Sequence, residues 1–158
     1  MESGGKMKES RLRRYEPDDF TACMKVFDSN SPKFFAPEER GRFSDFLQDF
    51  TSISRSYFVL TLAESVVACG GLIVDDAGGK ASLEWGMVHR DFHKQGLGQL
   101  LTQSRLELAR TNPRIKEVTI DTSQHSRGFY ERHGFIVTSV KTDEFGPGLD
   151  CWHMTLRL

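Results

Sequence analysis

The most informative feature of this sequence is a short turn with two glycines, set between a strand pattern and a helix pattern. Residues 82–89 have the composition of a strand, and Leu97, Leu100 and Leu101 then recur on one helical face. Gly96 and Gly98 lie in the turn and carry no side chain, so a ligand can approach the backbone closely. The free N–H groups and positive dipole end of a helix N-terminus favour a phosphate. The sequence therefore predicts a phosphate-binding turn, with a plain tight turn as the alternative.

Two common nucleotide-binding loops do not match this chain. A dinucleotide fingerprint starting at Gly96 would need a third glycine at position 101, where the chain has Leu101. A Walker loop ending at Lys80 would need glycine at position 74 and Ser or Thr at position 81, and the chain has Val74 and Ala81. Neither loop is predicted.

Hydrophobic periodicity predicts an alternation of strands and helices along the whole chain. Strands are expected at residues 11–15, 57–62, 66–74, 82–89, 116–121, 135–140 and 151–158. Helices are expected at about 16–30, 37–50, 97–112 and 123–133, the second of them rich in Phe. A bend at Gly146-Pro147-Gly148 is expected to join the last two strands. This order predicts an α/β (α+β) fold, a mixed sheet with helices on both faces.

Composition limits the classes of protein to which the chain can belong. Its 158 residues fit one domain, expected at residues 10–158, with residues 1–9 as a disordered N-terminus or a remnant of expression. With 21 Lys+Arg against 22 Asp+Glu, the net charge of -1 argues against a nucleic-acid partner. No apolar run reaches the roughly 18 residues of a membrane span, so no membrane partner is expected.

The chain has three cysteines, Cys23, Cys69 and Cys151, and each lies in an apolar neighbourhood. They are too few and too scattered for a disulfide framework, and they lack the spacing of a zinc site. Buried free thiols are expected, which is typical of the reducing cytoplasm. His89 and His93 are four residues apart, but they flank a turn and no third ligand completes a set, so no metal is predicted.

The glycine turn resembles the acetyl-CoA loop of the GNAT superfamily of N-acetyltransferases. The family signature is (Arg/Gln)-x-x-Gly-x-(Gly/Ala) after the fourth strand, and residues 93–98 read His-Lys-Gln-Gly-Leu-Gly. His93 departs from the signature, which implies weaker side-chain help for the pyrophosphate. Residues 123–135 resemble a second family segment, with Phe129-Tyr130 and Gly134-Phe135 in place and Ser123 instead of Asn. The resemblance implies the GNAT fold, with a largely antiparallel sheet of about seven strands and about four flanking helices.

The resemblance also implies an activity, the direct transfer of an acetyl group from acetyl-CoA, as co-substrate, to an amine. In the family the pantetheine arm lies between the fourth and fifth strands, and an N–H near Val88 would polarise the thioester oxygen. The residues expected at the cofactor are Met87, Val88, His89, His93, Lys94, Gln95, Gly96, Leu97, Gly98, Gln99, Ser123 and Arg127.

Two residues are expected to carry the proton transfers. Tyr130 matches the usual general acid of the family, and a packed tyrosine is the alternative. Glu84 is the candidate general base on the fourth strand, and the period of two places it on one face with positions 86 and 88. An exposed carboxylate, or one that only binds the amine, is the alternative for Glu84. His89 could relay a proton near neutral pH.

The sequence leaves the acceptor open. The resemblance implies a pocket built from the Phe34–Phe50 region and residues 141–151, and carboxylates there favour a cationic amine of a small molecule or peptide. They are Asp45, Asp49, Asp143, Glu144 and Asp150. Asp143 and Glu144 are the pair expected near the mouth of the pocket, with a solvated turn as the alternative. A non-catalytic acyl-CoA sensor or structural subunit, a longer acyl group, an alcohol acceptor and a homodimer also remain open.

Overall fold

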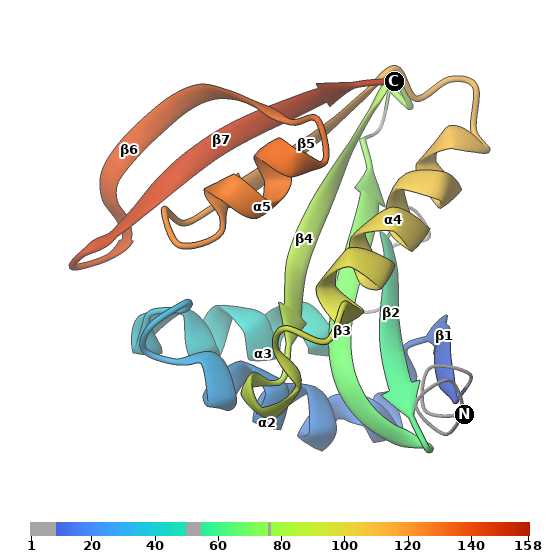
Figure 1. Cartoon of the computed structure of the whole chain (residues 1–158), viewed down its shortest axis with the longest axis vertical. Helices are drawn as coiled ribbons and strands as arrows, with labels where there is room; N and C mark the ends of the chain where they lie inside the picture. The colour runs from blue at the N-terminus through green and yellow to red at the C-terminus, as the bar shows by residue number, and fades with distance from the viewer. Residues whose placement is uncertain (1–8, 50–54, 76) are drawn as a thin grey trace.

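The computed structural model describes residues 9–49, 55–75 and 77–158, and it contains a seven-stranded sheet in the order β1-β2-β3-β4-β5-β7-β6 (Figure 1). The β4–β5 pair is parallel and every other pair is antiparallel. The strands are β1 (Ser10–Arg14), β2 (Arg55–Leu62), β3 (Ser65–Val74), β4 (Lys80–Val88), β5 (Glu117–Thr122), β6 (Ile136–Gly146) and β7 (Leu149–Arg157). The predicted mixed, largely antiparallel sheet is confirmed.

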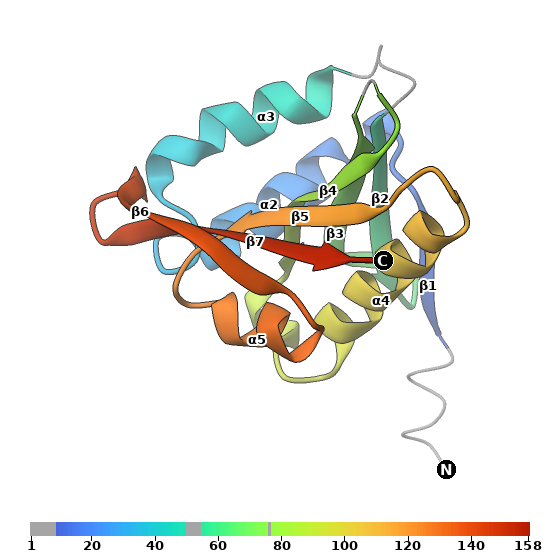
Figure 2. The ribbon, with the colours of Figure 1, turned by 90° about the horizontal axis from the view of Figure 1, so that it is seen from above.

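Helices cover both faces of the sheet, as Figure 2 shows. The helices on one face are α2 (Phe20–Asn30) and α3 (Arg40–Gln48), and those on the other are α4 (Leu97–Arg110) and α5 (Arg127–Arg132). Short 3-10 turns, η1 (Pro17–Asp19), η2 (Pro37–Glu39) and η3 (Arg90–Phe92), precede α2, α3 and the glycine turn. Proline opens η1 and η2, because its fixed φ suits a first helical turn. No helix among the described residues is long and apolar enough to cross a membrane.

The apolar pattern of each helix explains the face that it buries. On α2, Cys23, Met24 and Phe27 are 5% exposed or less and pack with β2 and β3. On α4, Leu106 and Ala109 pack against β3, β4 and β5 as part of a second cluster. The sheet is therefore the middle layer between two cores, and neither α2–α3 nor α4–α5 could bury its stripe without it.

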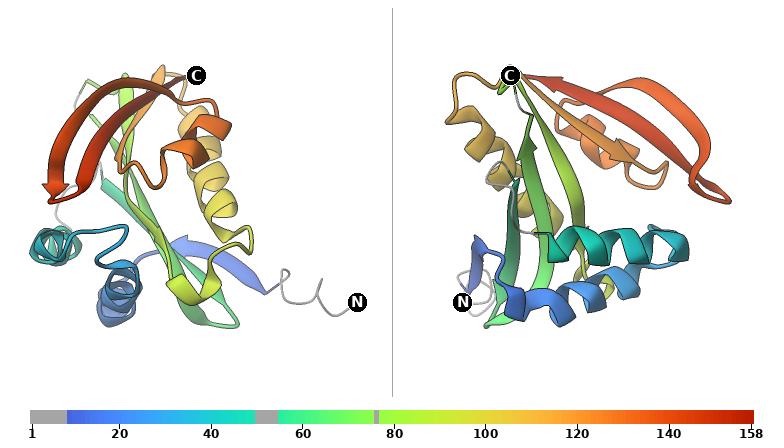
Figure 3. Two further views of the ribbon diagram at one scale, coloured as in Figure 1. Left: turned by 60° about the vertical axis from the view of Figure 1, so that its left-hand side comes forward. Right: turned by 180° about the vertical axis from the view of Figure 1, so that it is seen from behind.

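β4 and β5 pair over only four residues and then separate. Lys80–Leu83 pair with Glu117–Ile120, and beyond this point the two strands diverge (Figure 3). β4 also carries a bulge, because Cys69 pairs with Met87 but Gly71 pairs with Glu84, which leaves two residues of β4 opposite one of β3. This separation leaves a gap in the middle of the sheet.

Trp85 forms the bulge in an unusual conformation, with a φ of 49°. The hydroxyl of Tyr57 donates to the carbonyl oxygen of Trp85 at 2.7 Å, and Arg105 Nη1 donates to that of Gly71 at 3.1 Å. Because a bulge disrupts the ladder, these side chains replace hydrogen bonds that the strands no longer make.

The element boundaries differ from the sequence prediction in two places near the C-terminus. The helix expected from residue 123 begins at Arg127, because Ser123 starts a turn whose carbonyl accepts from the N–H of Ser126 at 3.0 Å. β6 runs to Gly146, six residues past its expected end, because its edge strand keeps pairing with β7 through an irregular stretch. Residues 1–8 and Phe50, which also carried predictions, lie outside the described residues.

Candidate active site

A cavity of about 640 Å³ lies at the gap between β4 and β5. Residues of the α2–α3 connection, β4, the glycine turn, α4, β5 and α5 line it, as does Phe145 of the β6–β7 hairpin. It therefore reaches from the α4–α5 face of the sheet to the α2–α3 face. A ligand in it would contact both sides of the sheet.

The two glycines of the turn have different physical roles. Gly96 is the N-cap of α4 with a φ of +81°, a conformation that favours glycine. At Gly98 a Cβ would lie 3.7 Å from the Phe129 ring and 3.8 Å from Val88 Cγ2, so its bare face points between β4 and α5. The first-turn N–H groups, those of residues 97–99, have no helical acceptor and no other recorded acceptor in the described part of the chain. They are available to an anion.

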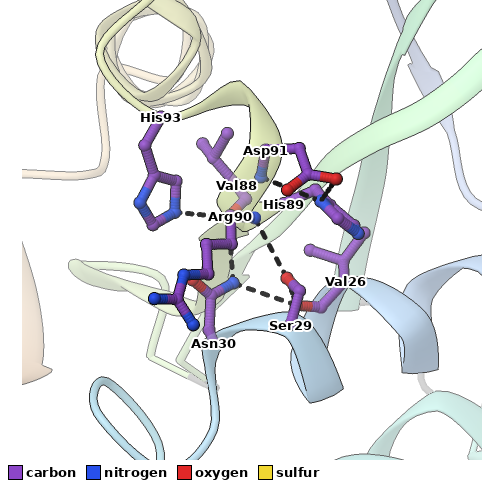
Figure 4. Close-up of polar contacts among 8 residues, drawn as sticks. All are labelled: Val26, Ser29, Asn30, Val88, His89, Arg90, Asp91 and His93. Atoms are coloured by element: carbon purple, nitrogen blue, oxygen red, sulfur yellow. Dashed lines mark hydrogen bonds and ion pairs between the residues drawn. The ribbon is translucent and has the colours of Figure 1, made fainter.

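The backbone of Val88 faces the gap. The N–H of His89 donates to Val67 of β3 at 2.7 Å, and neighbouring residues of a strand direct their backbone groups to opposite edges. The Val88 carbonyl already accepts from Asn30 Nδ2 at 2.9 Å and from His93 Nε2 at 2.8 Å (Figure 4). The N–H of Val88 is thus the backbone group left to pair with a ligand at this end of β4.

The side chain of His93, the residue that departs from the family signature, folds back onto the end of β4. Because a carbonyl oxygen only accepts, Nε2 of His93 carries the hydrogen in its contact with Val88. Its ring also packs edge-on against Phe34 at 5.6 Å. The side chain therefore closes the end of β4 and joins it to the α2–α3 connection.

The structure brings most of the predicted cofactor residues to the cavity, but not all. Those that line it are Met87, Val88, His93, Lys94, Gly96, Gly98, Gln99 and Ser123. His89, Gln95, Leu97 and Arg127 are not among the lining residues. Leu97 is buried in the core under α4, and Arg127 lies over the Trp152 ring at 4.8 Å and beside Glu131. The side chain of Leu97 therefore faces the core, and only its backbone N–H could serve the predicted contact. The predicted contacts of His89, Gln95 and Arg127 stay predictions.

Tyr130 lies on α5, is 8% exposed and lines the cavity. Its ring packs edge-on against Phe129 and Phe135, with centroids 5.0 and 5.7 Å away. Among the described residues its hydroxyl has no recorded hydrogen-bond partner, and it is not one of the fully enclosed polar atoms. The packing fixes the ring and leaves the hydroxyl to the cavity.

Glu84 also lines the cavity, but the sequence-based reasoning about its face was wrong. Gly86 faces Arg105 of α4, and Val88 packs in the core under the same helix. Leu83 packs on that side too, so its neighbour Glu84 faces the α2–α3 side. The bulge at Trp85 shifts the alternation by one residue. Glu84 accepts a hydrogen bond from Ser82 Oγ at 2.7 Å.

The sequence analysis missed a carboxylate on β5 that faces the same side. Val118 and Ile120 are buried under α4, so the alternation directs Asp121 to the α2–α3 face. Asp121 lines the main cavity, and its Oδ1 lies 2.6 Å from Nδ1 of His153 on β7. The period of two along β5 was the signal that could have found it.

A second cavity of about 310 Å³ adjoins the carboxylate of Asp121. Its lining changes the interpretation of Asp143 and Glu144, the pair expected near the mouth of the acceptor pocket. Its lining residues are Arg42, Asp121, Ser139, Lys141, Glu144, Phe145, Cys151 and His153. Asp143 is absent from both linings: its carboxylate accepts from the N–H of Gly148 at 2.9 Å, and its own N–H donates to Asp150. Asp143 and Asp150 hold the hairpin, whereas Glu144 faces a cavity.

The cysteines are free and buried, as expected. Burial, and then the charge of Asp121, raise the pKa of Cys151 to about 11. A hydrogen bond with Cys69 and burial raise the pKa of Cys23. Cys151 and Cys23 are therefore protonated at neutral pH and poor nucleophiles. The described residues contain no group of three or more His, Cys, Asp or Glu that could hold a metal ion.

A seven-stranded sheet that opens beside a glycine turn defines a class of acyl-transferring domain, and comparisons with known proteins agree. The acetyltransferase (GNAT) family matches residues 23–135 of this sequence. The chain belongs to this family. A search of curated protein sequences found no significant match.

Solved structures of the same fold superpose over nearly the whole chain. A GNAT-family protein from Desulfovibrio desulfuricans has a TM-score of 0.79 and 22% identity, covering 94% of this chain and 98% of its own. The ribosomal-protein-S18-alanine N-acetyltransferase of Escherichia coli has 0.77 and 18%, covering 94% and 93%. A variant of a spermidine N-acetyltransferase from Vibrio cholerae has 0.74 and 15%, covering 95% and 94%. At these identities the likeness shows the fold alone.

Replacing Gly98 tests where the cofactor lies. A tryptophan there would project between Val88 and Phe129, so Gly98→Trp is expected to weaken CoA binding at least tenfold, as measured by calorimetry. Gln103→Trp, at an exposed position of the same helix, is the control. Unchanged CoA affinity in a folded Gly98→Trp protein would show that the cofactor does not bind at this turn.

Proposed function

We propose that the protein is an acetyl-CoA-dependent N-acetyltransferase that transfers the acetyl group directly to a primary amine. The observation that carries the proposal is one cavity that joins the free N–H groups of α4 to Tyr130 and then to two carboxylates, Glu84 and Asp121. The anion site suits the pyrophosphate of CoA, and the carboxylates suit an amine. The buried free thiols support a location in the cytoplasm.

The reaction needs three groups, and the cavity supplies a candidate for each. An ammonium has no lone pair, so Glu84 takes a proton from the amine, directly or through water. The amine nitrogen then bonds to the thioester carbon, and the N–H of Val88 stabilises the negative charge on its oxygen. When the carbon–sulfur bond breaks, Tyr130 gives its proton to the leaving thiolate.

No covalent intermediate with the enzyme is part of this scheme. The high pKa of Cys151 keeps its thiol protonated, and a thiol is a far weaker nucleophile than a thiolate. Direct transfer predicts a ternary complex of enzyme, acetyl-CoA and amine, which sequential kinetics with two substrates would reveal.

The acceptor enters on the α2–α3 side, where the β6–β7 hairpin partly covers the cavity. A Cβ at Gly146, near the hairpin tip, would lie 2.8 Å from the Cβ of Ala36, so β6–β7 and the α2–α3 connection touch. An amine on a slender group, of a small molecule or a peptide end, fits such an entry. The E. coli and V. cholerae neighbours are named for a ribosomal protein and for spermidine, so both kinds belong in the test.

A panel of amines tests the function. Polyamines, aminoglycosides, amino acids and peptides are incubated with acetyl-CoA, and free thiol release is followed. The expected result is release with at least one class of amine, together with the mass of an acetylated product. Tight CoA binding without release for any amine would favour a non-catalytic acyl-CoA sensor instead.

Removing the hydroxyl of Tyr130 tests the acid. Tyr130→Phe keeps the packing against Phe129 and Phe135, so kcat is expected to fall at least tenfold while the KM for acetyl-CoA changes little. Tyr15→Phe, away from the cavity, is the control. An unaltered kcat would leave Tyr130 as a packing residue.

Neutralising Glu84 tests the base. General-base catalysis contributes about 10²–10⁴-fold, so Glu84→Gln is expected to lower the rate by at least 100-fold and to flatten the rise of rate with pH. Glu107→Gln, exposed on α4, is the control. If the Glu84 variant keeps the wild-type rate from about pH 6 to 9, Asp121 becomes the leading candidate.

Asp121 is expected to attract the protonated acceptor before the amine loses its proton. Asp121→Asn should raise the KM for a cationic amine several-fold at low salt, with a smaller effect at high salt because ions screen the charge. CoA affinity should not change. Asp18→Asn, an exposed carboxylate of η1, is the control. The same KM as the wild type at low salt would eliminate this role.

A further inference from the structure

Arg105 of α4 is a charged side chain in the interior of the protein. It is 1% exposed and is the largest fully buried side chain among the described residues. Nη1 donates to the carbonyl oxygen of Gly71 at 3.1 Å, and Nε lies 3.4 Å from that of Leu101. Within the described part of the chain, no carboxylate lies close enough to form an ion pair with it.

Two glycines make room for this guanidinium. A Cβ on Gly86 would lie 2.8 Å from Nη2, and one on Gly70 would lie 3.0 Å from Cζ and Nη1. A side chain at Gly86 would force the guanidinium to shift, since real Cβ atoms essentially never approach within 3.0 Å, and one at Gly70 would press on it and move it slightly. The space beside the bulge of β4 is thus occupied by Arg105 from α4 in place of side chains from β3 and β4.

The hydrogen-bonding capacity of Arg105 is only partly used. A guanidinium has five N–H donors and keeps its charge in proteins. Two carbonyl oxygens accept from it, and Nη2, the atom nearest Gly86, has no recorded acceptor among the described residues. A buried charge without a counter-ion is costly. Arg105 also lines the main cavity, so its unused donors can reach a ligand.

The position of Arg105 along α4 indicates which part of a ligand it would meet. It lies seven residues, about two turns and about 10.5 Å, beyond Gly98, on the same side of the helix. A ligand whose phosphates bind at the glycine turn and whose arm enters the cavity would bring its far end toward Gly86 and Arg105. For a CoA thioester that far end is the acyl group.

We propose that Arg105 is an acyl-binding residue, which donates a hydrogen bond to an oxygen atom of the acyl group carried by CoA. The proposal rests on the proposed use of acyl-CoA. The oxygen is either the thioester carbonyl, which any acyl group has, or the terminal carboxylate of a short dicarboxylic acyl group. Both supply the acceptor that the guanidinium lacks within the protein.

Binding measurements with three CoA species test the proposal. Calorimetry gives the Kd of free CoA, acetyl-CoA and succinyl-CoA for the wild type, Arg105→Met and Arg105→Gln. Methionine removes every donor at similar length, whereas glutamine keeps an amide that can still donate to Gly71. Arg110→Met, exposed at the end of the same helix, is the control.

The wild type is expected to bind at least one acyl-CoA more tightly than free CoA. In both Arg105 variants, the ratio of the Kd of free CoA to the Kd of that acyl-CoA is expected to fall at least tenfold. Equal losses for acetyl-CoA and succinyl-CoA would identify the thioester carbonyl, and a loss confined to succinyl-CoA would identify a terminal carboxylate. Affinity for free CoA should stay within about twofold of the wild type.

Two results would overturn the proposal. One is a wild type that binds free CoA as tightly as both acyl-CoA species, and this measurement does not depend on whether a variant folds. The other is a folded variant that keeps the wild-type preference, which would leave Arg105 as a residue that only completes the bulge. A wild type that binds none of the three species would instead contradict the proposed function.

Discussion

The loss of pairing between β4 and β5 after Leu83 and Ile120 is the constraint on which the site depends. A backbone N–H that leaves a sheet needs another partner, and at Val88 the structure leaves the N–H toward a cavity. A ligand with amide groups can take the place of the missing strand there. Under the proposed function, the gap would hold the arm of the acyl-CoA along β4, with the N–H of Val88 directed at the thioester oxygen.

The bulge that accompanies this gap is stabilised from both faces of the sheet. On the α2–α3 side the hydroxyl of Tyr57 holds the Trp85 carbonyl, and the Trp85 ring packs against Phe35 and Phe43. On the other side Arg105 holds Gly71. Phe43 and Phe46 of α3 are thus core residues beside Trp85. A positive φ at a bulky residue persists because this packing over-determines it.

Local patterns predicted the element order and the glycine turn, because each depends on residues close in sequence, whereas Tyr130 was singled out by the resemblance to the family. The side of the sheet that Glu84 faces was not predictable in this way, since one bulged residue reverses the alternation and nothing in the local composition marks it. The role of Asp143 was missed for a related reason: its partner Gly148 is set by how the hairpin closes. Asp121 shows the opposite case, because the pattern was present and only its pairing with His153 required the fold.

The carbonyl oxygen of Val88 joins the two halves of the site. It accepts from His93 of the glycine turn, on the side proposed for CoA, and from Asn30 at the end of α2, on the acceptor side. Asn30 is 4% exposed and also donates to Val26, so it cannot turn away without leaving a buried amide unsatisfied. The residue that breaks the family signature, His93, therefore serves to fix the end of β4. The backbone N–H groups of the turn and Lys94 then remain for the proposed anion, and the two contacts of the Val88 carbonyl oxygen hold this residue, with its N–H, beside the cavity.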